Sequence, residues 1–343
     1  MADEEKVFFN IINREFKPFQ EEIFDLYQKL GSFEKVWQKI SKNRIGLAER
    51  DPEKEFEKVL RAGAKIITLA DPAYPESLKN INQPPLGFYL LGNLDLGELP
   101  LAVVGTRRAG SYGLGLAKRF AGDLGRVGVT IVSGLALGVD QASHKGAVEM
   151  KSKTIAVIGA GLDLALDSPN RSLIEKILEN DGGIVSEFAF GVPAMPYHFP
   201  LRNRIIAGLS RGVIVIEAPI DSGSLITARF ALENNREVFV VPAEITNRNF
   251  DGSHQLLKQG AKLITKAEDV LEEFGFQTAN RIKTLKLSRD EELVFDQLQI
   301  GRLTFEELRD KTKLAANELL ALLTYMEMRG LVKNINGYFH RLN

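Results

Sequence analysis

The sequence predicts an α/β protein built around a doubly wound, mostly parallel sheet. Short apolar runs rich in Val and Ile recur through the middle of the chain, and glycine turns separate them from amphipathic segments such as residues 114–124. A continuous apolar run indicates a strand buried on both faces, which is typical of a parallel sheet covered by helices on each side. The alternation of such runs with helical segments indicates the crossovers of a doubly wound sheet.

The first sixty residues predict helices instead of strands. Apolar residues recur there at helical spacing, Gly31 and Gly63 end the first and last of the helices, and Ser32 caps the second. We therefore expect a small helical domain of the SAM/HhH-like type over residues 1–63, with no chemistry of its own. The predicted helices cover residues 19–30, 33–40 and 56–60.

The strands are expected in a central domain over residues 64–276. Two apolar runs, at residues 65–69 and 86–91, lie on either side of a proline-containing turn cluster at residues 71–75. From Leu101 onward the order of strand, glycine turn and helix repeats. The six strands of this repeat are expected at residues 101–104, 129–132, 154–158, 183–186, 212–216 and 237–241.

The C-terminal part predicts a second, smaller domain. Residues 277–287 are polar and basic and contain no aromatic residue, so we expect a linker there. Three helical patterns then precede Asn336-Gly337, a strong signal of a β-hairpin. Helices followed by a hairpin indicate a winged helix over residues 288–343. The helices are expected at residues 290–298, 304–312 and 314–328, and the hairpin strands at residues 331–334 and 338–341.

The third of these C-terminal helices is poor in positive charge. It carries Glu318 and Glu327, and the cations Lys313 and Arg329 lie only at its ends. A helix that reads DNA is richer in cations. We therefore expect the winged helix to bind protein, or to bind DNA only weakly.

Composition excludes several classes of function. The 343 residues include no cysteine, which removes disulfides, thiolate metal sites and cysteine nucleophiles, and the four histidines are too scattered to suggest zinc. No apolar run approaches the roughly 18 residues that cross a bilayer, and the N-terminus has no secretory signal. We expect a cytoplasmic protein without metal, cofactor or membrane contact. The net charge of −1 argues against a uniformly basic surface but permits a local basic groove.

The turn after the first strand of the repeat is a candidate phosphate site. It reads Gly105-Thr106-Arg107-Arg108, and residues 101–120 contain four basic and no acidic residues. Ligands of an open α/β sheet bind beyond the carboxyl ends of its strands. The glycine spacing does not fit the G-x-G-x-x-G pattern of a dinucleotide site, and an arginine pair suits a phosphodiester. A tight turn with solvated arginines is the alternative.

Two other turns have a structural and a functional interpretation. The glycines of residues 133–140, Gly134 among them, are equally consistent with close approach to a ligand and with a purely structural role. We expect Asp140 to cap a helix and Glu217 to accept hydrogen bonds, in preference to acid–base roles. The segment 222–224, Ser-Gly-Ser, opens a predicted helix and forms either an anion-binding nest or an ordinary N-cap.

The segment 198–211 combines an aromatic ring with cations. Phe199 lies three residues before Arg202, and Arg204 and Arg211 follow with no acidic residue between them. Guanidinium groups match phosphate oxygens, and a flat ring stacks on an unpaired base. Core packing is the alternative for Phe199. No serine in these turns has a nearby histidine with an orienting acid, so nucleophilic catalysis has no support in the sequence.

These segments, in this order, resemble the DprA, or Smf, family (DNA processing protein A) over residues 64–275. Each segment alone is a weak signal, and the specificity lies in the set. The matching segments are residues 103–107 (VVGTR), 133–140 (SGLALGVD), 199–210 (FPLRNRIIAGLS) and 222–228 (SGSLITA), with flanks at 71–75 (DPAYP) and 260–264 (GAKLI). The helical N-terminus and the winged helix also resemble appendages of this family.

The resemblance implies a function without catalysis. Proteins of this family have an extended Rossmann-like core that dimerises. They bind single-stranded DNA that enters the cell in natural transformation, protect it, and help to load the recombinase RecA onto it. The alternative from another class is a Rossmann-like nucleotide-cleaving enzyme of the phosphoribohydrolase type, which needs a Pro-Gly-Gly-x-Gly-Thr loop. Here residues 242–244, Pro-Ala-Glu, come nearest and lack the glycines.

The resemblance also assigns roles to residues. Arg107 is expected to hold a phosphate, Phe199 to lie against a base, and Arg202 and Arg204 to line the same groove. Family members often carry Lys or Arg where this chain has Met195 and Pro196, and we expect Tyr197 or His198 to replace that phosphate contact in part. The residues expected to bind nucleic acid are Gly105, Thr106, Arg107, Arg108, Gly134, Phe199, Arg202, Asn203, Arg204, Ser222, Gly223 and Ser224.

Overall fold

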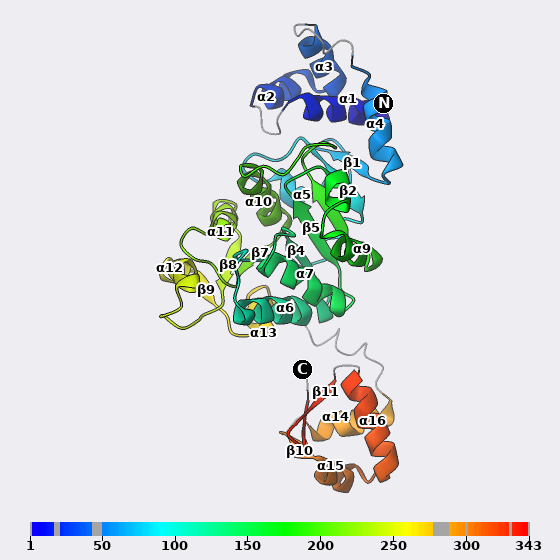
Figure 1. Ribbon diagram of the computed structural model, residues 1–343, viewed down its shortest axis with the longest axis vertical. Helices are drawn as coiled ribbons and strands as arrows, with labels where there is room; N and C mark the ends of the chain where they lie inside the picture. The colour runs from blue at the N-terminus through cyan, green and yellow to red at the C-terminus, as the bar shows by residue number, and fades with distance from the viewer. Residues whose placement is uncertain are drawn as a thin grey trace. The chain divides into compact units, whose positions relative to one another are not determined.

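The computed structural model describes residues 2–16, 21–42, 50–276, 288–298, 301–328 and 331–341 (Figure 1). The chain forms two compact units, Met1–Gln277 and Thr278–Asn343. The linker expected at residues 277–287 lies outside the described residues, as do the first two residues of the helix expected at 19–30. Within the described residues, no helix is both long enough and apolar enough to cross a membrane.

The first unit is built on a mixed sheet, and its described residues form nine strands. The strand order is β1-β2-β6-β5-β4-β3-β7-β8-β9, and every pair from β6 to β9 is parallel, whereas β1–β2 and β2–β6 are antiparallel. This confirms the doubly wound, mostly parallel α/β fold. The strands are β1 Lys65–Thr68, β2 Gly87–Gly92, β3 Pro100–Val104, β4 Thr130–Ser133, β5 Thr154–Ile158, β6 Gly183–Ser186, β7 Gly212–Val215, β8 Glu237–Val240 and β9 Lys262–Leu263.

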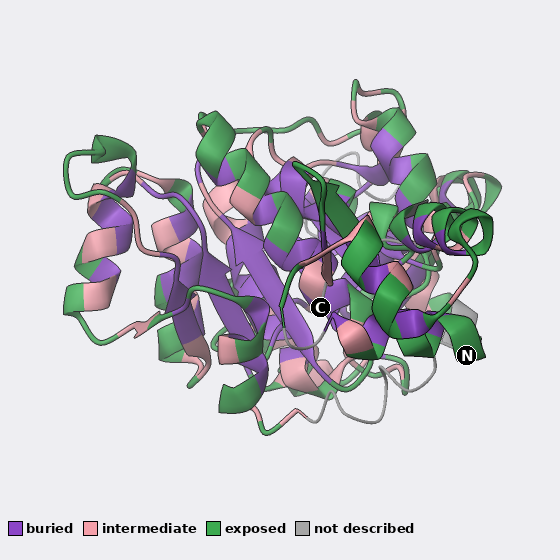
Figure 2. Ribbon diagram, turned by 90° about the horizontal axis from the view of Figure 1, so that it is seen from below, coloured by how far each residue is buried: buried purple, intermediate pink, exposed green. Residues whose placement is uncertain are grey.

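The apolar runs occupy the centre of this sheet. Every residue of β3, β4, β5, β6 and β7 is buried, and Figure 2 draws these central strands in the colour of buried residues. A strand that helices cover on both faces has to be apolar along its whole length. Sequence analysis missed β9, because an edge strand of two residues, one half-buried and one exposed, has no such run.

Helices cover both faces of the sheet. Core residues of α5, α10, α11 and α12 share one cluster with the sheet, and those of α6, α7 and α13 share another. The helices of this part are α5 Glu76–Lys79, α6 Ser111–Arg126, α7 Val139–Glu149, α8 Leu162–Leu166, α9 Arg171–Glu179, α10 His198–Leu209, α11 Gly223–Glu233, α12 Asp251–Lys258 and α13 Ala267–Glu273, with a 3₁₀ turn, η1, at Arg248–Phe250.

The N-terminal helices pack onto the same unit. The expected Ser32 cap is confirmed, since its side chain accepts a hydrogen bond from the Lys35 backbone N–H. These helices share one apolar cluster with Ile66 and Tyr89 of the sheet, so the first unit continues through the boundary expected after residue 63. Sequence analysis missed the first of them. Their bounds are α1 Ala2–Glu15, α2 Glu21–Leu30, α3 Phe33–Ser41 and α4 Pro52–Arg61. The division at residue 63 and the SAM/HhH-like type stay predictions.

The second unit contains the expected helices and hairpin. Asn336 and Gly337 have φ values of 54° and 84°, as a two-residue hairpin turn with positive φ at both positions requires. Sequence analysis missed β10, which pairs with β12. The elements are α14 Arg289–Gln297, β10 Leu303–Thr304, α15 Phe305–Thr312, α16 Ala316–Met328, β11 Val332–Ile335 and β12 Tyr338–Arg341. The winged-helix assignment stays a prediction.

Candidate nucleic-acid interface

A cleft of about 680 Å³ opens at the carboxyl ends of the central strands. Its lining comes from the turns after β3, β4 and β7, from the first turns of α10 and α11, and from η1. In the sheet, β3 lies between β4 on one side and β7 on the other, so the strand order reverses direction at β3. The cleft therefore lies at the topological switch point, where open α/β sheets bind their ligands.

The turn after β3 presents two cations. Arg107 and Arg108 are exposed, whereas Thr106 is buried and donates its backbone N–H to the Glu217 carbonyl at 2.7 Å. A Cβ at Gly105 would lie 2.9 Å from that same carbonyl oxygen and closer to Val139, so glycine is required there. The turn is thus fixed by its neighbours while both guanidinium groups stay accessible.

Arg107 lies over the ring of Phe199. The guanidinium carbon is 4.1 Å from the ring centroid, within the range of a cation–π interaction. Both residues line the cleft, and they come from different elements, the β3–α6 turn and the first turn of α10. One wall of the cleft therefore combines a positive charge with a flat aromatic ring.

Arg202 lines the cleft, as expected, but is almost wholly buried. Its side chain is only 3% exposed and donates from Nη1 to the carbonyl of Gly134, at 2.6 Å, and to that of Val157. Burial lowers the pKa of Arg202 to about 10, so it remains charged at neutral pH. Arg202 therefore ties together the ends of β4 and β5 and places a positive charge under the cleft floor.

Asp140 joins two turns. We expected it to cap α7, but Gly138 is the N-cap residue, and the Asp140 carboxylate instead accepts backbone N–H groups from Gly105, Gly134 and Ala136. Burial raises the pKa of this carboxyl to about 6, against the opposing effect of the Arg202 guanidinium. Asp140 is thus a structural centre of the cleft, because it holds the turns after β3 and β4 in one arrangement.

Glu217 accepts hydrogen bonds, as predicted. Its carboxylate is 2% exposed and accepts from the Gly110 backbone N–H, at 3.1 Å and 3.3 Å, and from Nδ2 of Asn249 at 2.8 Å. A Cβ at Gly113 would overlap this carboxylate. Glu217 therefore fixes the start of α6 to the end of β7.

The turn after β7 has the geometry expected of a helix start. Ser222 caps α11 by accepting the Ser224 backbone N–H at 3.3 Å, and Asn203 donates from Nδ2 to the Gly223 carbonyl at 3.1 Å. Gly223 is exposed, with open space where a Cβ would stand. All four residues line the cleft.

The structure corrects three expectations. Arg204 does not line the groove: it is 1% exposed, and its Nη2 donates to Oε1 of Glu187 at 2.6 Å. Gly134 is buried below the cleft, where a Cβ would collide with Arg202. His198 does not replace the missing cation, because it is buried and stacks on Phe188 at 4.0 Å between ring centroids.

The positions where relatives often carry a cation, and the neighbouring Tyr197, were expected to lie at the cleft. Pro196 lines the cleft, and Tyr197 is 46% exposed beside it in sequence. The lining residues that sequence analysis missed include Asp221 and Asn249. Asp221 directly precedes the segment 222–224, so its position in the turn after β7 could have predicted that it lines the cleft. Asn249 comes from η1, far along the chain, and has no comparable signal. In the described part of the chain, no three His, Asp or Glu side chains gather as a metal site would require.

Comparisons with known proteins match the part of the chain that forms this cleft. A family model described as "DNA recombination-mediator protein A" matches residues 65–275. The chain is 43% identical over 224 residues to the DNA processing protein DprA of Streptococcus pneumoniae. This match covers 65% of this chain and 77% of that protein. It is 45% identical over 204 residues to Protein Smf of Escherichia coli K12, covering 59% of this chain and 54% of that one.

Two solved structures share the fold. The X-ray structure of DprA from S. pneumoniae matches with a TM-score of 0.61 and 41% identity, covering 66% of this chain and 79% of that chain. A structure of DNA processing protein A from Helicobacter pylori, described in terms of its single-stranded DNA binding mode, matches with a TM-score of 0.55 and 30% identity. That match covers 61% of this chain and 95% of that chain.

Proposed function

This chain belongs to the DNA recombination-mediator protein A family, and from this premise we propose that it binds single-stranded DNA without turnover. We propose that it protects single strands taken up in natural transformation and helps to load the recombinase RecA onto them, as a homodimer through its Rossmann-like core. The observation that carries the proposal is the Arg107–Phe199 pair on the wall of the cleft.

The chemistry of the cleft favours an unpaired strand over a duplex. A guanidinium group binds a phosphate of any sequence, and an aromatic face stacks on a base only when that base is not already stacked in a duplex. The N-terminus of α11, with the backbone N–H of Gly223, adds a donor for a second phosphate. Charge, ring and donor together match a short stretch of sugar-phosphate backbone with one base turned inward.

The carboxylates of the cleft favour binding over cleavage. Asp140 accepts three backbone N–H groups, and Glu217 accepts from Gly110 and Asn249, so each is held as part of the scaffold. A general acid or base has to reach the reacting atom of its substrate. Asp140 and Glu217 are both buried, which argues against such a role for either of them.

The test compares labelled single-stranded and duplex oligonucleotides by fluorescence anisotropy. We expect wild type to bind the single strand more tightly. Phe199→Ala removes the stacking face, which is worth about 1–3 kcal/mol per base, so affinity should fall roughly fivefold to a hundredfold. Phe199→Tyr keeps the ring and serves as the matched control. Equal affinity for both DNA forms, or release of a nucleobase on incubation, would contradict the proposal.

A further inference from the structure

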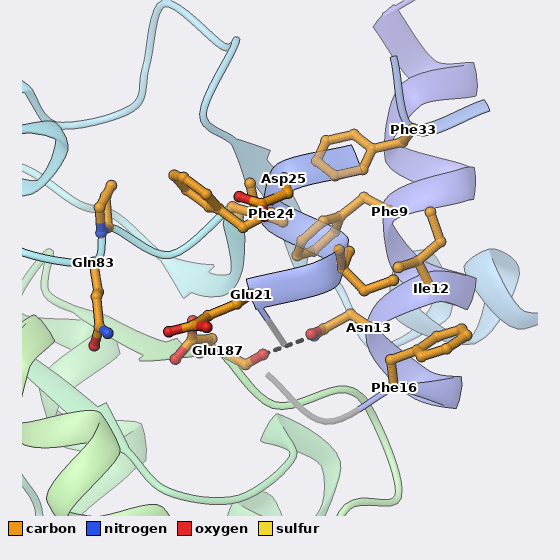
Figure 3. A pocket seen from close by; sticks show the side chains of 14 residues that line it. Phe9, Ile12, Asn13, Phe16, Glu21, Phe24, Asp25, Phe33, Gln83 and Glu187 are labelled. Atoms are coloured by element: carbon orange, nitrogen blue, oxygen red, sulfur yellow. Dashed lines mark hydrogen bonds between the residues drawn. The ribbon is translucent and has the colours of Figure 1, made fainter. Parts of the chain in front are cut away.

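A second cavity lies where α1 and α2 meet the start of β2 (Figure 3). Its volume is about 290 Å³, near the lower end for small-molecule sites. No residue that lines it also lines the cleft. The cavity therefore has to be explained separately from the binding of nucleic acid.

Part of the lining is strongly apolar. Four phenylalanine rings of the described residues line it, three from α1 and α2 or beside them and one from α3, and Figure 3 shows the rings of Phe9, Phe24 and Phe33 on one side of the cavity. Aromatic and aliphatic walls favour an apolar body, because its burial removes apolar surface from water. The four rings are Phe9, Phe16, Phe24 and Phe33.

The polar part of the lining is negative. Among the described residues, it contains the carboxylates of Glu21, Asp25 and Glu187 and the amides of Asn13 and Gln83, and no lysine, arginine or histidine. Such a lining opposes phosphates and other anions and attracts cations. The cavity is thus opposite in charge character to the arginine-bearing wall of the cleft.

Glu187 supplies an acceptor that has no donor among the described residues. Its side chain is 5% exposed, and Oε1 accepts from Arg204, whereas Oε2 has no hydrogen-bond partner among the described residues. A buried acceptor without a donor is costly, so an N–H group of a ligand would stabilise it. The backbone carbonyl of Glu187 accepts from Nδ2 of Asn13 at 2.7 Å, which fixes this residue against α1.

We propose that this cavity binds a small organic cation with an aromatic or alkyl body. The ammonium group faces the carboxylates of Glu21, Asp25 and Glu187, and the body lies among the phenylalanine rings. The proposal rests on this cavity alone and does not depend on the function proposed for the cleft.

The test uses ligand-observed saturation-transfer NMR with the full chain. The probe is 3-phenylpropylammonium, and its controls are the neutral 3-phenylpropan-1-ol and the anionic 3-phenylpropanoate. We expect a dissociation constant of roughly a millimolar or below for the ammonium, at least about fivefold weaker binding of the alcohol, and still weaker binding of the carboxylate. Absence of ammonium binding at about 10 mM, or equal binding of all three, overturns the proposal.

Charge-reversal variants locate the binding. Glu21→Lys combined with Asp25→Lys changes two exposed lining residues, and Glu22→Lys changes an exposed residue of the same helix that does not line the cavity. The double variant should weaken ammonium binding roughly fivefold or more, and Glu22→Lys should leave it within twofold. Circular dichroism checks that both fold. Equal effects of the two variants would place binding elsewhere and overturn the proposal.

Discussion

Arginines that look equivalent in the sequence have different environments in the folded chain. Arg107 is exposed over the Phe199 ring, Arg202 is buried below the cleft floor, and Arg204 is paired with Glu187 away from the cleft. An exposed guanidinium exchanges water for a phosphate at little cost, whereas a buried one is already committed to its protein acceptors. Of these three arginines, Arg107 is therefore the one with the freedom to bind DNA.

The buried carboxyl of Asp140 makes stability depend on pH. Its pKa of about 6 in the folded protein lies above the ordinary value, so the folded state holds the proton more strongly than the unfolded chain. Stability from this group is therefore highest near pH 4 and falls as the pH rises toward 6. A difference of about two pKa units corresponds to roughly 2–3 kcal/mol. In urea unfolding, the stability of wild type relative to Asp140→Asn should fall by that amount between pH 4 and pH 7.

A pH-independent difference between these two proteins would contradict this account of Asp140. The Asn variant is the suitable reference, because it keeps the size of the side chain and cannot ionise. Hydrogen bonds that Asn fails to make shift its stability equally at every pH, so only the slope tests the carboxyl.

At the scale of elements, α10 connects the cleft to the core. Its first turn carries Phe199, its middle carries Arg202 and Asn203, and Arg204 points to the other side, where it pairs with Glu187 after β6. One helix thus presents its N-terminal end to the cleft and anchors itself by a buried ion pair. The position of Phe199 depends on that anchor.

The Glu187–Arg204 pair should behave as a coupled buried pair. Glu187→Ala or Arg204→Ala alone leaves a buried charge without its partner and should cost about 3–5 kcal/mol in urea unfolding. The double variant Glu187→Leu/Arg204→Met removes both charges and should lie closer to wild type than either single variant. Additive losses in the double variant would show that the two side chains act independently.

The second unit makes a separate prediction about an element. Helix α16 contains Glu318 and Glu327 and no basic residue within its bounds. The isolated segment 285–343 has its own apolar core, so it can be examined alone. At physiological salt it should show no gel shift of duplex DNA below about 1 µM, the tight end of ordinary non-specific binding. Tight duplex binding by this segment would contradict the prediction.

Several elements were predictable because their signal is local. The six strands of the central repeat are buried on both faces, and an apolar run is the direct consequence of that burial. The hairpin at Asn336-Gly337 follows from the positive φ that these residues tolerate. The position of Arg107 at the cleft was predictable too, because Arg107 lies in the turn that follows a strand.

Other features depend on partners far along the chain. Arg202 and Arg204 are two residues apart on one helix, so they face different neighbours. The sequence does not reveal that Arg204 forms an ion pair with Glu187. Asp140 lies at a helix start, two residues after Gly138, which suggests a cap, yet its acceptor role depends on the turn after β3. Asn249 reaches the cleft only because η1 packs against Glu217.

At the scale of the whole molecule, the net charge of −1 provides no general attraction for DNA. Binding has to come from local cations, of which Arg107 and Arg108 are the exposed ones within the described lining of the cleft. A small number of phosphate contacts gives a shallow but measurable dependence of affinity on salt, because each contact releases a fraction of a counterion.

The most direct measurement is the salt dependence of single-strand affinity in wild type and in Arg107→Ala. The matched control is Arg119→Ala, since Arg119 is exposed on α6 and does not line the cleft. If Arg107 holds one phosphate, its removal should reduce the slope of log affinity against log salt by about 0.7, and Arg119→Ala should leave the slope unchanged. A slope that Arg107→Ala does not alter would contradict the assignment of the cleft as the DNA site.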